Sequence, residues 1–373
     1  MQVAIGSDLL DGERCGMQIA LHEVLDGMIR LGQSSGMHLV HGRNLSNGFQ
    51  HSFQSIRVPR SSGFGTGLYW SQVSVPRRIR NHGIDVLWWP CQIMPPVKSP
   101  VPLVITVWDL APLNYSDENW NWLSVSIKYR WILARALTRA AHIICHSQAI
   151  AEEVMRRFRV PAKRITIIYP GLSTRFREEI TSPNLSYPDG YILYVGTCTT
   201  RKNVKLLIDA YKLLFDRGIP NKLGLLLSGP QDARAGIVAY ARQIGIPEER
   251  IILLNAVEAD ALPDVYRQAA LFAFPSLYEG FGLPLIEAMA MGLPVVALNR
   301  STMPEVLGSS GILVDQANSI DFAAGIQSAL ARAHGQGDEV SALARRRAAQ
   351  FDWDTAGRAI VSVLKQAVRD NTR

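Results

Sequence analysis

Short apolar runs alternate with helical patterns along most of the chain, and this alternation constrains the fold more than any other feature. Val86–Trp89 and Leu103–Val107 have the length and composition of buried strands, whereas Met17–Leu31 repeats apolar residues with the spacing of one helix face. Strands joined by helices pair in parallel, because the helix carries the chain back along the sheet. The pattern therefore predicts an α/β fold built on doubly wound parallel sheets.

The alternation falls into two series, which indicates two domains. With 373 residues, of which 47% are hydrophobic, the chain is long enough for two large cores. The segment Gly171–Asp189 contains prolines and polar residues without periodicity, as a linker does. We expect a first Rossmann-like domain over residues 1–175 and a second over 176–373, with a cleft between them. The tail is expected to be helical over Phe322–Ala333 and Ser341–Val368.

The stretch Leu271–Glu287, L-F-A-F-P-S-L-Y-E-G-F-G-L-P-L-I-E, predicts a strand, a loop and a helix that begins near Leu283. Gly280 and Gly282 flank Phe281, so the backbone there can turn sharply and approach a ligand closely. The first amides of the helix are unpaired and carry the positive end of its dipole. They therefore suit a phosphate group.

Two glutamates of this stretch add further groups to the same corner. Glu287 lies about one turn into the helix, where its carboxylate can accept hydrogen bonds from two neighbouring hydroxyls of a ribose. Glu279, on the loop, can meet another part of the same ligand. Contacts for ribose, diphosphate and a further polar group indicate a nucleotide sugar. The alternative is an ordinary strand, loop and helix whose Glu279 is solvated and whose Glu287 is exposed.

The pattern of Glu279, seven residues and then Glu287, with G-F-G-L-P after the first glutamate, resembles the signature of the retaining glycosyltransferases of family 4. The resemblance implies the GT-B fold, two facing Rossmann-like domains with an interdomain cleft. It also implies that the last helix, over 353–370, crosses back to the first domain. The second domain would hold most of the nucleotide sugar donor, and the first domain the acceptor.

The segment Tyr191–Asn203, Y-I-L-Y-V-G-T-C-T-T-R-K-N, ends with two cations just before the next predicted helix. Arg201 and Lys202 can neutralise a diphosphate and the charge that develops on it as the glycosidic bond breaks. They resemble the family's R-K-N segment, but Thr197 stands where many members have a basic residue, so we expect Arg201 to carry more of the work. Two surface cations at a helix start are the alternative, which the helix dipole disfavours.

Two segments of the first half resemble acceptor-side and donor-side parts of the family. Gly16, in G-E-R-C-G-M-Q, resembles the glycine of the family's first loop, which faces the donor; simple turn geometry is the alternative. Asp109, in T-V-W-D-L, can orient an acceptor hydroxyl or accept its proton, or else cap the following turn. Trp108 replaces the histidine that related enzymes often have, and this leaves the donor sugar open.

No metal or other cofactor is expected besides the nucleotide sugar, which is a co-substrate. The four cysteines are widely separated and lack the spacing of metal ligands, which favours a reducing compartment. Asp352-Trp353-Asp354 matches the D-x-D metal motif of other glycosyltransferases, but it precedes a helix for which Asp354 is a good N-cap. Thr302–Glu305 fits a helix capping box.

The net charge of +7 lies entirely in the first half of the chain. Residues 1–180 contain 20 Lys and Arg against 13 Asp and Glu, and the remaining residues are balanced. Anionic membrane lipids or a diphosphate-linked acceptor fit such a surface, and so does a solvated surface that binds nothing. Nucleic acid is not expected, since no nucleic-acid motif accompanies the charge. We expect a cytoplasmic protein, peripheral to the inner face of the membrane if this surface binds lipid.

These features together favour a retaining, metal-independent hexosyltransferase that uses a nucleotide diphosphate sugar and a saccharide acceptor. The resemblance to the family makes GDP-mannose the first choice of donor. The basic first half of the chain suggests an acceptor at the membrane surface, such as a lipid-linked oligosaccharide of a bacterial polysaccharide or lipopolysaccharide pathway. The alternatives are a nucleotide-sugar epimerase or phosphorylase on the same fold, or an inactive partner protein that binds a sugar nucleotide.

Overall fold

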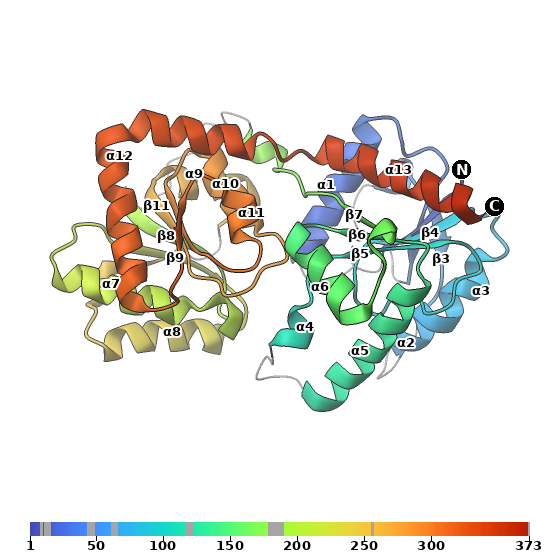
Figure 1. Ribbon diagram of the computed structural model, residues 1–373, viewed down its shortest axis with the longest axis horizontal. Coiled ribbons are helices and arrows are strands. Elements are labelled where there is room, and N and C mark those ends of the chain that lie inside the picture. Colours follow the sequence, from blue (N-terminus) through green and yellow to red (C-terminus); the bar gives the residue numbers. More distant parts are fainter. Residues whose placement is uncertain are drawn as a thin grey trace. The chain divides into compact units, whose positions relative to one another are not determined.

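The computed structural model describes residues 1–7, 10, 16–42, 49–60, 66–115, 122–177, 190–254 and 257–371, and the chain divides into two compact units (Figure 1). Unit 1 comprises Met1–Gly171 together with Asp352–Arg373, and unit 2 comprises Leu172–Phe351. The division at Gly171 lies slightly before the boundary expected at 175. Part of the expected linker, residues 178–189, lies outside the described residues.

Unit 1 contains a parallel sheet whose described strands follow the order β3-β2-β1-β4-β5-β6-β7. The winding reverses between β1 and β4, as the alternation of strands and helices predicted. Most strands are short runs of Val, Ile and Leu, because a sheet covered on both faces has no solvent side. The elements are β1 Val3–Gly6, α1 Gly16–Arg30, β2 Met37–His41, β3 Gln54–Arg57, α2 Thr66–Tyr69, α3 Val75–Ile79, β4 Val86–Trp89, β5 Leu103–Val107, α4 Ala111–Asn114, α5 Trp122–Arg139, β6 His142–Cys145, α6 Gln148–Phe158, β7 Ile165–Ile167 and α13 Trp353–Asn371.

Unit 2 contains a second parallel sheet, ordered β10-β9-β8-β11-β12-β13 among the described residues, which reverses between β8 and β11. Alternate residues of its strands enter two cores: Leu193 and Phe272 face one, and Ile192 and Leu271 face the other. The elements are β8 Tyr191–Thr197, α7 Val204–Asp216, β9 Leu223–Ser228, α8 Gln231–Gln243, β10 Ile251–Leu253, α9 Leu262–Arg267, β11 Ala269–Phe274, α10 Leu283–Ala290, β12 Val295–Leu298, α11 Met303–Leu307, β13 Ile312–Val314 and α12 Ser319–Ala348.

The last helix, α13, lies beside α1 within unit 1 (Figure 1). Arg30 of α1 donates to Oδ1 of Asp354 across 2.7 Å, and Gly357 packs against Met28. The helix expected over 353–370 therefore belongs to the unit that contains the start of the chain, although the whole of unit 2 separates the two in sequence.

The helical structure expected over Ser341–Val368 is interrupted at residues 349–352, and the last helix begins where the helix over 353–370 was expected. α12 ends at Ala348 and α13 begins at Trp353. Asp352 caps the new helix, because its Oδ2 accepts a hydrogen bond from the amide of Thr355 at 2.8 Å. Asp352, and not Asp354, is therefore the N-cap, and Asp354 is engaged with Arg30.

Strand β3 was not expected from the sequence. Among the described strands it pairs with β2 alone, and of its four residues only Ile56 is buried. An edge strand of this kind buries too few side chains to form an apolar run, so periodicity does not reveal it.

Candidate active site

The segments that carry the predicted site residues of unit 2 follow two neighbouring strands, β8 and β11. These strands flank the position where the strand order reverses, and ligands of doubly wound sheets bind outside the carboxyl ends of the strands at such a position. Arg201 and Lys202 follow β8, and Glu279 follows β11. The topology of unit 2 therefore brings the two motifs to one edge of the sheet.

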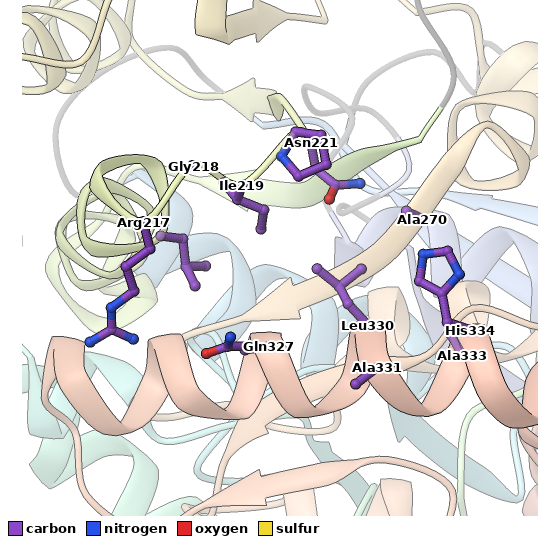
Figure 2. Close-up of a pocket in the computed structure, with 12 residues that line it drawn as sticks. Arg217, Gly218, Ile219, Asn221, Ala270, Gln327, Leu330, Ala331, Ala333 and His334 are labelled. Atoms are coloured by element: carbon purple, nitrogen blue, oxygen red, sulfur yellow. The ribbon is translucent and has the colours of Figure 1, made fainter.

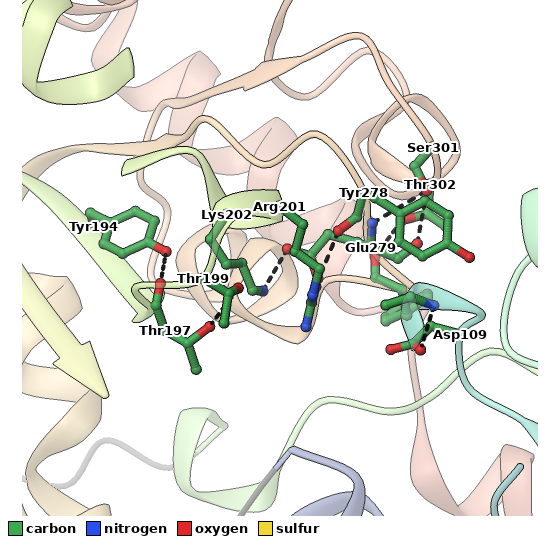
Figure 3. A network of polar contacts seen from close by, with 12 residues as sticks. Asp109, Tyr194, Thr197, Thr199, Arg201, Lys202, Tyr278, Glu279, Ser301 and Thr302 are labelled. Atoms are coloured by element: carbon green, nitrogen blue, oxygen red, sulfur yellow. Dashed lines mark hydrogen bonds and ion pairs between the residues drawn. The ribbon is translucent and has the colours of Figure 1, made fainter. Parts of the chain in front are cut away.

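Glu279 forms ion pairs with both predicted cations (Figure 3). Its Oε1 lies 2.6 Å from Nζ of Lys202, and its Oε2 lies 3.3 Å from a guanidinium nitrogen of Arg201. Glu279 is 5% exposed and Lys202 is 8% exposed. From the sequence, the three residues were expected to contact a ligand separately. The structure joins them into one cluster with an excess of one positive charge, in which Glu279 and Lys202 are buried and Arg201 is partly exposed.

The same cluster fixes the two loops to each other. Arg201 donates to the carbonyl oxygen of Tyr278 at 3.1 Å, and its own carbonyl oxygen accepts from the amide of Leu277 at 2.8 Å. The loop after β8 and the loop after β11 are thereby held by both backbone and side-chain bonds. Any group that binds these residues meets a preorganised surface.

The environment of Glu279 keeps it ionised. Burial raises the pKa of this carboxyl, but the charges of Lys202 and Arg201 and the hydrogen bond from Lys202 more than offset this effect, so that its pKa lies below the ordinary value. The negative charge is consequently stable at neutral pH and holds both cations in place.

Helix α10 begins at Leu283, as predicted, directly after Gly282. Gly282 has φ +95°, a backbone conformation that L side chains rarely adopt, so glycine is required there. The ring of Phe281 is buried against Phe351, with centroids 5.3 Å apart. Phe281 was expected to contact the donor, but the structure assigns its side chain to the core and leaves only its backbone for a ligand; Gly280, beside it, is also buried.

Glu287 lies on α10, and its Oε2 accepts a hydrogen bond from the hydroxyl of Tyr266 at 2.7 Å. Tyr266 is completely buried, and burial together with the neighbouring Glu287 raises its pKa well above the ordinary value. The tyrosine therefore stays a hydrogen-bond donor and fixes the carboxylate. The sequence did not identify Tyr266, since an apolar-patterned helix gives no sign of its hydroxyl's partner.

Ser301 and Thr302 support the loop that carries Glu279. The hydroxyl of Ser301 donates to the carbonyl oxygen of Glu279 at 2.8 Å, and Thr302 donates to the carbonyl oxygen of Phe281 at 3.0 Å. The capping box expected over Thr302–Glu305 is therefore wrong: the hydroxyl of Thr302 does not cap α11 but holds the neighbouring loop.

In unit 1, Asp109 follows β5 and accepts hydrogen bonds from the amide of Ala111 at 3.0 Å and from the side chain of Gln92 at 3.4 Å. The first of these bonds is the turn-capping role that the sequence left open. Gln92 in turn accepts from the amide of Trp108 at 3.1 Å. Asp109 is half-buried, and these two bonds fix the orientation of its carboxyl group.

Trp108 is anchored by two contacts. Its indole nitrogen donates to the carbonyl oxygen of Pro90 at 2.8 Å, and its ring centroid lies 3.7 Å from that of His146. Burial lowers the pKa of His146 to about 4, although its hydrogen bond to the carbonyl of Ile168 acts in the opposite direction. The imidazole beside Trp108 is therefore neutral at pH 7.

Gly16 is the first residue of α1 and is exposed, with no atom within 4 Å of the position that a Cβ would take. The rest of its predicted loop, residues 11–15, lies outside the described residues. The space at Gly16 is thus open to a ligand, and equally to a larger side chain.

A hollow of about 470 Å³ on unit 2 contains none of the predicted residues (Figure 2). Arg217 and Asn221 line it before β9, and Ala270 lines it near the start of β11. It therefore lies at the amino edge of the sheet, opposite the edge at which doubly wound sheets bind ligands. Among the described residues, no group of three or more His, Cys, Asp or Glu side chains could hold a metal ion.

The chain combines two doubly wound parallel units with paired charges at the carboxyl edge of the second. It matches two models of known protein families. Residues 16–176 match the model described as Glycosyltransferase Family 4, and residues 189–332 match the model described as Glycosyl transferases group 1. The chain belongs to family 4 of the GT-B glycosyltransferases, which confirms the family and fold class predicted from its motifs.

Individual relatives refine this assignment. The O-antigen chain mannosyltransferase B of Escherichia coli is 33% identical over 247 residues, which cover 62% of each chain. The serotype-specific mannosyltransferase WbdA of Escherichia coli is 30% identical over 226 residues, or 58% of this chain and 27% of the relative. The crystal structure of HepE from Anabaena in complex with UDP matches with a TM-score of 0.73 and 20% identity, covering 98% of this chain and 100% of that one.

The matched region thus spans less than two thirds of each of these curated mannosyltransferases. Within the part of the chain that the structure describes, no helix has the length and apolar character needed to cross a membrane.

Proposed function

We propose that the chain is a retaining, metal-independent glycosyltransferase that transfers a hexose, with mannose from GDP-mannose as the first candidate, to a saccharide acceptor. The observation that carries this proposal is the buried cluster of Glu279, Lys202 and Arg201 at the reversal point of the second sheet, beside the start of α10. The names of the relatives support mannose and the assembly of a bacterial polysaccharide or lipopolysaccharide.

In this proposal the donor binds at the carboxyl edge of unit 2. The first amides of α10, from Leu283 onward, bind the diphosphate. Glu287, fixed by Tyr266, accepts hydrogen bonds from the ribose hydroxyls. Arg201 and Lys202 supply the positive charge that the leaving diphosphate needs as its negative charge grows, and the excess of one charge in the cluster makes this stabilisation net favourable.

The chemistry exchanges one bond at the anomeric carbon. The bond from that carbon to the diphosphate oxygen breaks, and the acceptor oxygen attacks from the face that the diphosphate leaves, so the configuration is retained. The acceptor proton passes to the departing diphosphate. Glu279 is already paired with two cations and is 5% exposed, which argues against a nucleophilic role. It instead orients the cations and the sugar hydroxyls, and Asp109 orients the acceptor hydroxyl.

The first experiment measures thermal stability against a panel of nucleotide sugars and free nucleotides in the presence of EDTA. A ligand at about 100 times its dissociation constant adds about 2.7 kcal/mol to stability. We expect one nucleotide sugar to stabilise the protein selectively without metal. The variant Glu287→Gln keeps an acceptor for Tyr266 but loses the carboxylate, so we expect weaker binding, whereas Glu248→Gln, on an exposed residue of the same unit, leaves binding unchanged.

A second measurement separates the proposal from its rivals. Transfer of the sugar to an oligosaccharide acceptor supports a glycosyltransferase. Release of free nucleotide without an acceptor indicates an epimerase, and dependence on inorganic phosphate indicates a phosphorylase. Selective binding with no turnover under any of these conditions supports an inactive partner protein, and no binding at all removes the donor site.

We further propose that the acceptor is lipid-linked and that the protein acts at the cytoplasmic face of a membrane. The excess of positive charge in the first half of the sequence supports this location. Turnover of an oligosaccharide linked to a polyprenyl diphosphate well above that of the same oligosaccharide free in solution is the expected result.

A further inference from the structure

Helix α5 presents large apolar side chains to solvent on one face. Ile127 is 63% exposed and Trp131, four residues later, is 55% exposed. The opposite face, which includes Tyr129, Leu133 and Leu137, is buried in unit 1. The exposed pair therefore does not belong to the core of the unit. Because residues four positions apart lie on the same face of a helix, the two side chains are neighbours.

The same helix is strongly basic. Its 18 residues contain no Asp or Glu, and they carry Lys128, Arg130, Arg135 and Arg139, all of them exposed. The guanidinium carbon of Arg135 lies 4.3 Å from the centroid of the Trp131 ring. This cation–π contact holds the indole in position on the surface while the positive charge remains available to an anion.

A groove of about 670 Å³ runs beside α5 and is lined by both kinds of side chain. Leu68 and Val97 line it with Trp131 and contribute apolar side chains, and Lys98 adds a further cation. Tyr69, next to Leu68 on α2, is 60% exposed. A second hollow, of about 660 Å³, is lined by Arg57, Arg77 and Arg78 near α3. No acidic residue among the described residues lines either hollow.

We propose that the face formed by α5, and by the groove that its side chains line together with Leu68 of α2, docks on the surface of an anionic lipid bilayer. Trp131 and Ile127 would enter the headgroup region, where an indole has an apolar body and a polar nitrogen to satisfy. Lys128, Arg135 and Arg139 would lie at the level of the lipid phosphates, with their methylene stems along the apolar part.

The combination of side chains favours a bilayer over other anionic partners. A polyanion in water needs cations alone, so an exposed Ile127 beside Trp131 would gain little from it. A bilayer surface can bind both kinds of side chain, because apolar groups enter the acyl boundary while basic groups contact the lipid phosphates nearer the water. The proposal concerns unit 1 only and does not rest on the donor site or on transfer activity.

The test is co-sedimentation of the full chain with vesicles of phosphatidylglycerol and phosphatidylethanolamine, and in parallel with vesicles of phosphatidylcholine. We expect binding to the anionic vesicles alone, weakened by added salt. Lys128→Gln and Arg139→Gln should each weaken it about fivefold. Trp131→Ser should weaken it about tenfold and leave the salt dependence in place. These residues are exposed, so folding is checked simply by circular dichroism.

Matched controls come from exposed residues elsewhere. Lys365→Gln, on α13 of the same unit, and Ile320→Ser, at a side chain that is 65% exposed in unit 2, should bind as the unaltered protein does. Equal binding to phosphatidylcholine, or unchanged binding by all three α5 variants, overturns the proposal. Binding of single-stranded RNA that is stronger than vesicle binding and is lost in the same variants also overturns it, and assigns the face to nucleic acid.

Discussion

The two units share one winding scheme but place their charges in opposite ways. Unit 2 buries charge at the carboxyl edge of its sheet, where Glu279 and Lys202 are less than a tenth exposed and are paired with each other. The described part of the corresponding edge in unit 1 holds the neutral His146 against Trp108, and the basic side chains of α5 stay outside in solvent.

This difference indicates how one scaffold can serve two partners. A buried, fully paired charge is costly to assemble but already oriented when a ligand arrives, which suits a small, highly charged donor. Exposed cations cost little and interact over a wide area, which suits a large anionic surface. The contrast also predicts that the units respond differently to substitution and to pH.

The largest expected effect is that of Glu279→Gln. Lys202 would then be buried without its carboxylate, and we expect unit 2 to lose about 3–5 kcal/mol of stability. All eight tryptophans lie within residues 1–171 and 352–373, so tryptophan fluorescence follows unit 1 alone, whereas circular dichroism follows both units. In guanidinium chloride, the dichroism transition of unit 2 should shift and the fluorescence transition should not.

The double variant Glu279→Gln with Lys202→Met provides the control. It removes both charges, so it should recover much of the stability that the single substitution loses. A fluorescence transition that shifts as far as the dichroism transition would erase the distinction between the two units.

Acidification should weaken unit 1 before unit 2. The pKa of His146 is lowered from 6.5 to about 4 by burial, so the unfolded imidazole gains a proton between these values while the folded one stays neutral. Stability of unit 1 is therefore complete above pH 6.5 and falls by roughly 3 kcal/mol as the pH drops to about 4. Glu279 has a lowered pKa, so its contribution is present above 4.5 and is lost only as the pH falls through its folded value.

Unfolding followed by fluorescence and by dichroism at a series of pH values checks this order. His146→Gln should reduce the pH dependence of the fluorescence transition, and the part that remains belongs to His38 and His142, whose pKa values burial also lowers. A dichroism transition of unit 2 that moves first on acidification contradicts the prediction.

A smaller effect is expected at the start of α10. Gly282→Ala forces an L side chain to φ +95° and brings its Cβ to 3.1 Å from Leu285, which should cost unit 2 about 1–2 kcal/mol. Gly236→Ala on α8, where the Cβ meets nothing within 4 Å, should instead add about 0.5–1 kcal/mol. Denaturation followed by dichroism compares the two, and equal responses would show that the turn before α10 is not strained.

The smallest effect is that of Asp109→Asn, which is the same chemical change in unit 1 as the first substitution is in unit 2. The amide oxygen of asparagine can still accept from Ala111, and Asp109 is only half-buried, so we expect a change within about 0.5 kcal/mol. Fluorescence-detected unfolding measures it directly. A loss of several kcal/mol would mean that unit 1 also depends on a buried charge.

The fold could be predicted well wherever burial is complete. The expected strands Val86–Trp89 and Leu103–Val107 have the observed bounds, because strands covered on both faces must be apolar throughout. The edge strand β3 escaped detection because its environment is half solvent. The N-cap of α13 was wrongly assigned to Asp354, because the capping role of Asp352 depends on where the helix starts in space, which periodicity does not specify.

The site could be predicted as a set of residues but not as an arrangement. Motif spacing named Glu279, Arg201 and Lys202, yet their ion pairs join positions 77 and 78 residues apart and exist only because β8 and β11 are neighbours. The partners Tyr266 and Ser301 carry no motif, since a hydroxyl becomes a supporting group only through what the fold places opposite it. The roles of Gly16, Leu283 and Glu287 toward a donor remain predictions that nucleotide binding will test.

The division of unit 1 between the two parts of the chain has a consequence for biosynthesis. Helix α13 covers α1, but the ribosome makes the whole of unit 2 between them. Unit 2 can therefore close its core during translation, whereas the nascent first unit must wait with the flank of α1 uncovered. Pausing or truncation after residue 351 would leave a finished second unit attached to an incomplete first one, a species that chaperones and proteases recognise by its exposed apolar surface.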